Sequence, residues 1–137
     1  MSRVLGVDIG AARVGLAISD PSGTLAGGHG FIEFRSYKEL VDRLMKIAGE
    51  ENVEEYVIGL PLNMRGDRGP QAAKAEKLAE MLRASDDRPV HLIDERLTTV
   101  EAARQIHASG RKVRKGRIDE VAATIILQAY LDGKKQQ

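Results

Sequence analysis

The segment RVLGVDI-GAA-RVGLAIS, residues 3–19, contains two short apolar runs separated by three small residues. Short apolar runs bounded by turn-forming residues are typical of β-strands, so we expect a hairpin with strands at 3–9 and 13–19. A third extended stretch, around 25–34, follows the turn residues Asp-Pro-Ser-Gly at 20–23. Its glycines predict an irregular or bulged strand. The chain therefore begins with an antiparallel meander of three strands.

After the meander, the apolar period changes to that of a helix. Leu40 and Leu44 belong to a three- and four-residue repeat, and Ser36 with Glu39 forms a capping box that predicts where the helix starts. The further expected elements are a strand at 55–60, a helix over about 70–83, a strand at 90–93, a helix that starts with a capping box at Thr98 and Glu101 and ends at Gly110, and a helix over 118–131. A strand-helix-strand crossover is right-handed and pairs its strands in parallel. We therefore expect an α/β fold with a mixed five-stranded sheet, three antiparallel strands followed by two parallel ones, and helices on both faces.

Length and composition restrict the classes of protein. A chain of 137 residues is the size of one domain, 1–137, with a polar tail at 133–137 that we expect to fray. There is no cysteine, which excludes disulfides, thiolate metal sites and a cysteine nucleophile. No segment approaches the roughly 20 apolar residues of a membrane span, so we expect a cytoplasmic protein with no membrane partner. The net charge of +1 means that only a local basic patch can attract nucleic acid.

Asp8 is the first candidate for a functional residue. It interrupts an otherwise apolar strand, where an unpaired carboxylate costs several kcal/mol to bury. Gly6 and Gly10 flank it and allow a bulky ligand or backbone to come close. The alternative interpretation is a turn-forming aspartate at the end of a hairpin.

Asp94 and Glu95 form a second candidate group. They follow the strand at 90–93, at the edge of an open α/β sheet where ligand sites collect. Successive strand residues face opposite ways, so only one of the two can point toward Asp8, and the spacing does not decide which. The alternative is an acidic loop beside Arg96.

Asp119 is the third candidate, in the first turn of the last helix, where an acid also has the structural use of offsetting the helix dipole. Three acids from a first strand, a later strand end and a final helix can hold one or two Mg²⁺ or Mn²⁺ ions, which take oxygen ligands. Two such ions about 4 Å apart can activate a water and stabilise the leaving oxygen of a phosphodiester. The histidines at 29, 91 and 107 have no metal-ligand spacing, and we expect them to be structural.

Basic residues gather just before the third acid. The run at 111–117 contains Arg111, Lys112, Arg114, Lys115 and Arg117. Such a run can neutralise the phosphates of a nucleic acid, although a solvated loop would have the same composition. Arg65 and Arg68, in the glycine-containing loop at 63–69, are a second candidate phosphate clamp.

Motifs that follow one another along nearly the whole chain resemble those of one family. They are GVDIG at 6–10, RVGLA at 13–17, SD at 19–20, GLPLN at 59–63, DERLTT at 94–99, ID at 118–119, AA at 122–123 and ILQAYL at 126–131. This set resembles the YqgF/RuvX family, bacterial proteins that are similar to Holliday-junction resolvases and are described as pre-16S rRNA nucleases. The resemblance implies a ribonuclease H-like fold, which agrees with the expected order of strands and helices.

The resemblance also implies roles for individual residues. The acidic positions that match those expected to hold Mg²⁺ or Mn²⁺ are Asp8, Glu95 and Asp119. This favours Glu95 over Asp94, although Asp94 stays open as an additional ligand. Arg13, Arg96 and Thr98 fall on motif positions and are expected to orient the acids or the scissile phosphate.

The function implied is a metal-dependent endonuclease that processes the 5′ end of precursor 16S rRNA, acting as a monomer or homodimer on structured RNA. Two alternatives stay open: a Holliday-junction resolvase that cuts branched DNA, and a non-catalytic RNA-binding factor. An actin- or hexokinase-like ATPase would also begin with an Asp-x-Gly hairpin, but it needs a duplicated domain that this length does not supply.

Overall fold

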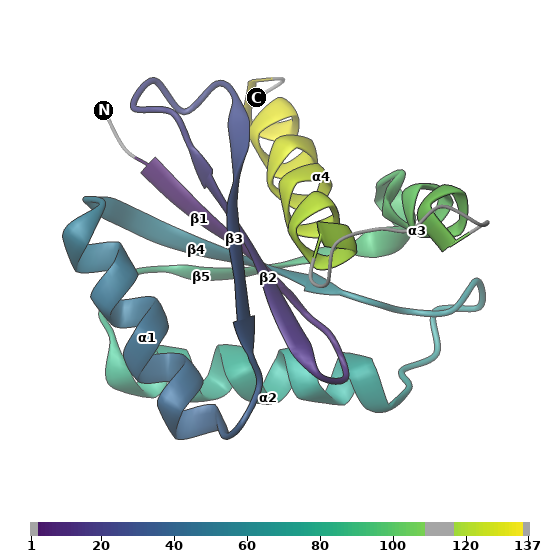
Figure 1. Cartoon of the computed structure of the whole chain (residues 1–137), viewed down its shortest axis with the longest axis horizontal. Coiled ribbons are helices and arrows are strands. Elements are labelled where there is room, and N and C mark those ends of the chain that lie inside the picture. The colour runs from purple at the N-terminus through teal and green to yellow at the C-terminus, as the bar shows by residue number, and fades with distance from the viewer. Residues whose placement is uncertain (1–2, 109–116, 136–137) are drawn as a thin grey trace.

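The computed structural model describes residues 3–108 and 117–135, with the side chains of 105–108 left out of the description (Figure 1). Its elements are β1 (Arg3–Ile9), β2 (Arg13–Ser19), β3 (Ala26–Glu33), α1 (Tyr37–Glu50), β4 (Val53–Leu60), α2 (Pro70–Ser85), β5 (Val90–Asp94), the short 3₁₀-helix η1 (Glu95–Leu97), α3 (Val100–Ala108) and α4 (Arg117–Lys135). The predicted order of strands and helices is therefore confirmed.

The strands form one mixed five-stranded sheet with the order β3-β2-β1-β4-β5. The pairs β1–β2 and β2–β3 are antiparallel, whereas β4 is parallel to β1 and β5 is parallel to β4. The β2–β3 register shifts between Gly15 and Ala17, and Gly30 on β3 has a φ of +78°. The predicted irregularity of the glycine-rich strand is thus a bulge that a positive-φ glycine accommodates.

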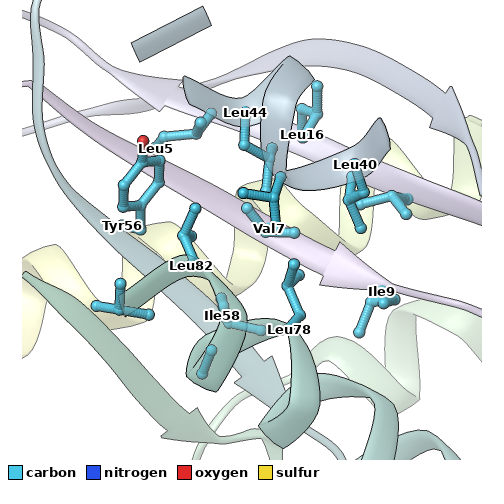
Figure 2. Close-up of a cluster of buried hydrophobic side chains, with 14 of the residues drawn as sticks. Leu5, Val7, Ile9, Leu16, Leu40, Leu44, Tyr56, Ile58, Leu78 and Leu82 are labelled. Atoms are coloured by element: carbon cyan, nitrogen blue, oxygen red, sulfur yellow. The ribbon is translucent and has the colours of Figure 1, made fainter. Parts of the chain in front are cut away.

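Both faces of the sheet are covered by helices, and β1 runs through the middle. Leu5, Val7 and Ile9 pack with α1 and α2 in one core, shown in Figure 2. Val4 faces the opposite way and packs with α4 in the second core. Since strand side chains alternate, Asp8 lies on the α4 side. Burial on both faces explains why β1 is an almost continuous apolar run.

Helix α4 packs very close to the strands because glycines leave room for it. A Cβ on Gly6 would lie 2.8 Å from the Cβ of Leu127, and a Cβ on Gly15 would collide with the backbone carbonyl of Asp119. The glycine at 15 therefore lets the first turn of α4 lie directly against β2. This close approach positions Asp119 beside the end of β1.

Two helix boundaries differ from those expected. The capping box at Thr98 and Glu101 is wrong, because α3 starts at Val100 and Thr98 is the residue that ends η1. Thr98 instead accepts a hydrogen bond from the Val100 amide at 3.2 Å and donates one to the Glu95 carbonyl at 2.7 Å. Helix α4 continues to Lys135, so the tail expected to fray is helical as far as it is described.

The other boundary predictions have different outcomes. The Ser36 cap is confirmed, since its hydroxyl accepts from the Glu39 amide at 3.1 Å. The predicted stop at Gly110 lies outside the described residues. Within residues 3–108 and 117–135, no helix is long and apolar enough to cross a membrane.

Substituting Gly15→Ala should destabilise the fold, because its methyl group would push α4 away from β2. Overpacking of this kind costs about 1–3 kcal/mol, and we expect a loss at the upper end of that range. Gly49→Ala, at a helical glycine with open space around it, is the matched control and should be neutral or slightly stabilising. Urea unfolding of both variants measures the difference; equal midpoints for the two would contradict the proposed close packing.

Candidate active site

Asp8 is a buried carboxylate near the carboxyl end of the central strand. Asp8 is only 3% exposed to solvent. Its Oδ1 accepts a hydrogen bond from Nη2 of Arg104 at 2.8 Å. The compensation that a buried carboxylate requires is therefore supplied by an arginine on α3.

Glu95 lies on the other side of the same guanidinium. It is the first residue of η1, directly after β5, and is 6% exposed. Its Oε1 accepts from Nη1 of Arg104 at 2.9 Å, whereas its buried Oε2 has no hydrogen-bond partner. A Cβ on Gly59 would lie 2.8 Å from that Oε2, so the glycine makes room for the carboxylate. One guanidinium thus bridges two carboxylates, one near the carboxyl end of β1 and the other directly after β5.

The electrostatics of the pair follow from burial and from mutual repulsion. Burial raises the pKa of Asp8 above its usual value; Arg104 opposes this rise and the charge of Asp119 adds to it. Burial also raises the pKa of Glu95, and the negative charge of Asp8 raises it further. Burial of Arg104 acts to lower its pKa, but the two carboxylates outweigh it and raise that pKa. The pair therefore has a strong requirement for a cation.

Asp119 approaches from α4 but has a different partner. Its Oδ2 accepts from Nε of Arg13 at 3.1 Å. A Cβ on Gly10 would lie 3.3 Å from its Oδ1, and Nζ of Lys74 donates to the Gly10 carbonyl at 2.8 Å. The turn after β1 is thus fixed from α2, and Asp119 lies against it. The structure brings all three predicted acids to one end of the sheet.

Asp94 points to a different partner from Glu95. Its Oδ1 and Oδ2 accept from Nε and Nη2 of Arg96 at 3.1 and 2.6 Å. The hydrogen bonds from Arg96 lower the pKa of this carboxyl. The geometry therefore links Glu95, and not Asp94, to Asp8, which the alternation of strand residues did not decide.

The carboxylates at this end of the sheet are the candidate ligands of a divalent cation. In the described part of the chain, no group of three or more His, Cys, Asp or Glu is arranged to hold a metal ion, because Arg13 holds Asp119 and Arg104 stands between the other two acids. Asp8 and Glu95 nevertheless offer hard oxygen atoms around one positive charge, and Oε2 of Glu95 lacks a partner. Oxygen donors of this kind suit Mg²⁺ or Mn²⁺, so the pair fits such an ion in place of the guanidinium.

The remaining predicted residues lie around this centre or outside the described chain. Arg65, Arg68 and Arg117 are exposed, and Nη2 of Arg68 pairs with Glu76 at 2.6 Å. A Cβ on Gly66, whose φ is +87°, would lie 3.3 Å from Arg96. The loop that carries the predicted clamp therefore packs near the site. The predicted basic residues outside the described part of the chain are Arg111, Lys112, Arg114 and Lys115.

A pocket of about 470 Å³ opens beside the carboxylate pair. Its apolar side is formed by Pro61, Leu62, Met64 and Val100, and Glu95 and Arg104 line it as well. Figure 1 shows α3 and the loop after β4 at the same end of the sheet, to the right of the view. The Glu95 and Arg104 side of the site is thus open to a cleft.

Two residues that support the site, Arg104 and Lys74, were not found from the sequence. Arg104 lies in the middle of an ordinary helical stretch, and Lys74 is one of two lysines on α2. The only available signal was indirect: a buried Asp8 needs a cation from somewhere in the chain. Of the histidines, His91 stacks on Tyr130 at 5.4 Å and Nε2 of His29 lies 4.0 Å from Glu51, away from the acids, and the side chain of His107 is outside the description.

Asp8→Asn should leave the free energy of unfolding at neutral pH unchanged or higher. Because burial raises the pKa of Asp8, the folded wild type binds that proton more tightly than the unfolded chain. Wild type therefore recovers stability as the pH falls through the raised pKa toward the usual 3.8, a gain that the variant lacks. The stability advantage of Asp8→Asn in urea unfolding should therefore shrink as the pH is lowered from neutral toward 3.8. A wild type that is more stable than Asp8→Asn at neutral pH would contradict this prediction. The control is Asp42→Asn, which changes an exposed carboxylate on α1.

Comparison with known proteins agrees with this architecture. The chain matches the family described as "RuvX: Holliday junction resolvase" over residues 2–133. A protein of Syntrophomonas wolfei is 42% identical over 133 residues, 96% of this chain and 94% of the relative. One of Caldanaerobacter subterraneus subsp. tengcongensis is 46% identical over 136 residues, 97% of this chain and 98% of the relative. Both carry the name "Putative pre-16S rRNA nuclease".

Solved structures extend the comparison to the fold. RuvC of Thermus thermophilus, bound to a Holliday junction substrate, has a TM-score of 0.62 at 12% identity and covers 100% of this chain and 98% of its own. The fowlpox virus Holliday junction resolvase has a TM-score of 0.56 at 13% identity and covers 96% of this chain and 99% of its own. These likenesses confirm the ribonuclease H-like fold. Because the family match and the relatives above 40% identity span nearly the whole chain, the protein belongs to the RuvX family.

Proposed function

We propose that this protein is an endonuclease that hydrolyses phosphodiester bonds in structured RNA, and that its substrate is the 5′ end of precursor 16S rRNA. The observation that carries the proposal is the pair of buried carboxylates, Asp8 and Glu95, which converge on one cation beside an open cleft. The relatives named as pre-16S rRNA nucleases support the choice of substrate. The proposal places the enzyme in the cytoplasm, as a monomer or homodimer.

Asp8 and Glu95 would hold Mg²⁺ or Mn²⁺, and Asp119 would complete the set. An ion bound there would supply a water of lowered pKa and would neutralise charge on the phosphate. No side chain of the pair then has to act as the nucleophile. The contribution of the protein is to hold the two carboxylates close together in a buried place, where a cation favours their ionised forms.

The surrounding cations have separate tasks in this proposal. Arg13 holds Asp119 at the start of α4 and so fixes the third acid relative to β1. Arg96 stays charged beside Asp94 at the rim of the cleft, where it can meet a phosphate of the strand. Arg65, Arg68 and the basic run at 111–117 would bind the backbone farther along. These contacts position the substrate without reading its sequence.

Branched DNA is the second candidate substrate. Two observations favour it: the family description refers to Holliday junction resolution, and the structural neighbours with TM-scores above 0.5 include a RuvC bound to a junction. A shared fold does not fix the substrate, so the two nucleic acids must be compared directly.

Asp8→Asn and Glu95→Gln should each lower the rate of cleavage by about 100-fold or more, because substitutions in the outer shell of metal sites alone cost 10- to 100-fold. The measurement is cleavage of a labelled 5′ fragment of precursor 16S rRNA and of a four-way DNA junction, each with Mn²⁺ or with EDTA. Asp42→Asn, exposed on α1, should cut like wild type.

The outcomes separate the candidates. Metal-dependent cutting of the RNA supports the proposal, and cutting of the junction alone would assign the protein to branched DNA. RNA binding by wild type without any cutting would favour a non-catalytic binding factor. Full activity in Asp8→Asn would refute the assigned site.

Arg65→Gln should weaken RNA binding and make it less sensitive to salt. Each phosphate contact that is lost removes about 0.7 from the slope of log affinity against log salt for a single strand, or about 0.9 for B-DNA. Fluorescence anisotropy of labelled RNA at several salt concentrations measures the slope. Arg35→Gln, which pairs with Glu39 on the exposed side of α1, is the charge-matched control. An unchanged slope in Arg65→Gln would remove Arg65 from the interface.

A further inference from the structure

Arg104 occupies the position between the two carboxylates that a divalent cation would need. Its Nη2 is 2.8 Å from Asp8 Oδ1 and its Nη1 is 2.9 Å from Glu95 Oε1. Its side chain is 30% exposed, although the carboxylates that it joins are buried. The guanidinium thus reaches from the cleft into the site.

A metal ion and this guanidinium cannot occupy the site together. Both would need the carboxylates of Asp8 and Glu95, one oxygen of each of which already accepts from Arg104, and two positive groups side by side repel each other strongly where water is excluded. Removing the guanidinium with nothing in its place would leave two buried carboxylates without a cation, which is also costly. Arrival of a metal and departure of Arg104 must therefore be coupled.

The cleft has room for the Arg104 side chain when it leaves the carboxylates, and it contains another acidic residue. The pocket of about 470 Å³ is lined by Arg104 itself and by Glu101, whose Oε2 is 3.7 Å from Nη1. Glu101 is exposed, so its pull on a guanidinium is weak in water. A phosphate of a strand in the cleft is a much better acceptor, since a guanidinium binds phosphate oxygens in bidentate fashion.

We propose that Arg104 couples metal binding to nucleic-acid binding: it neutralises Asp8 and Glu95 in the free protein and moves to a phosphate of the bound strand when a divalent cation takes its place. Metal loading of the free protein is then weak, and bound nucleic acid strengthens it. Because such coupling is reciprocal, the metal must strengthen nucleic-acid binding by the same factor. This inference rests on the proposed function but makes predictions that do not require cleavage.

The first test measures binding of Mn²⁺ to the free protein by electron paramagnetic resonance, without nucleic acid. Arg104→Gln should bind Mn²⁺ at least about tenfold more tightly than wild type, since a neutral amide no longer competes; tenfold is the factor that corresponds to 1.4 kcal/mol. Arg104→Lys, which keeps a positive charge, should remain close to wild type. Arg3→Gln removes a charge that pairs with Glu51 away from the site and should not change the affinity. Equal affinities in Arg104→Gln and wild type would overturn the proposal.

A second readout uses wild type and so does not depend on the folding of a variant. Titration with Mg²⁺ is followed by NMR of the ¹⁵N-labelled guanidinium of Arg104. We expect its side-chain resonances to move to those of an unpaired arginine at the same Mg²⁺ concentration at which the Asp8 and Glu95 carboxyl resonances shift. Carboxyl shifts with an unmoved guanidinium would overturn the displacement.

The third test measures the coupling itself. The affinity for a labelled RNA stem-loop is compared in EDTA and in Ca²⁺, a hard cation that takes the same oxygen ligands. Wild type should gain several-fold in Ca²⁺, whereas Arg104→Gln should gain less because it lacks the side chain that contacts the phosphate. An equal gain in both proteins would overturn the coupling. If the protein cleaves nucleic acid but shows no coupling of metal and RNA binding, the proposed nuclease stands and the role of Arg104 fails. If the coupling is present without cleavage, Arg104 is a coupling residue in a binding factor.

Discussion

The structure depends on one electrostatic constraint: two carboxylates, Asp8 and Glu95, are buried at one end of the sheet and must have a positive charge between them. Neither acid adds stability by itself, because burial raises the pKa of both and the charge of one disfavours ionisation of the other. The cost is tolerated because the free protein supplies Arg104 from α3. A site of this kind is held ready by the fold for a cation and cannot be explained by packing alone.

The sheet topology brings the acids together. β1, β4 and β5 are parallel, so Asp8 and Glu95 come from carboxyl ends at the same edge. The third acid depends on close packing, since the absence of a side chain at Gly15 lets the first turn of α4 lie against β2. Arg13 then pairs with Asp119, so the second strand of the hairpin that carries Asp8 also holds the acid of the last helix. In this part of the molecule, the packing of the core therefore also sets the positions of the acids.

The comparisons and the geometry answer different questions. Membership of the RuvX family and the likeness to RuvC and the fowlpox virus resolvase place the fold among ribonuclease H-like proteins. They do not decide between RNA and branched DNA, since one arrangement of acids serves either phosphodiester. The geometry adds that Arg13 and Arg104 pair with the acids of this chain. Activation, in that arrangement, involves an exchange of cations as well as the binding of a substrate.

The amino-acid sequence by itself determined the order of strands and helices and the candidate acids, Asp8, Asp119 and one of the pair Asp94 and Glu95, because these follow from side chains within a few residues of one another. It misplaced the start of α3, since Thr98 and Glu101 fit a capping box, whereas Thr98 ends η1 and its hydroxyl donates to the Glu95 carbonyl. The family resemblance favoured Glu95 over Asp94 and gave Arg13 an orienting role, and the tertiary structure joins Glu95 to Asp8 and pairs Arg13 with Asp119. Only the tertiary structure identified Arg104 as the shared partner of Asp8 and Glu95. Arg104 is 96 residues from Asp8, and Arg13 is 106 from Asp119. Contacts over such separations are set by strand order and helix packing, which no local pattern of residues contains.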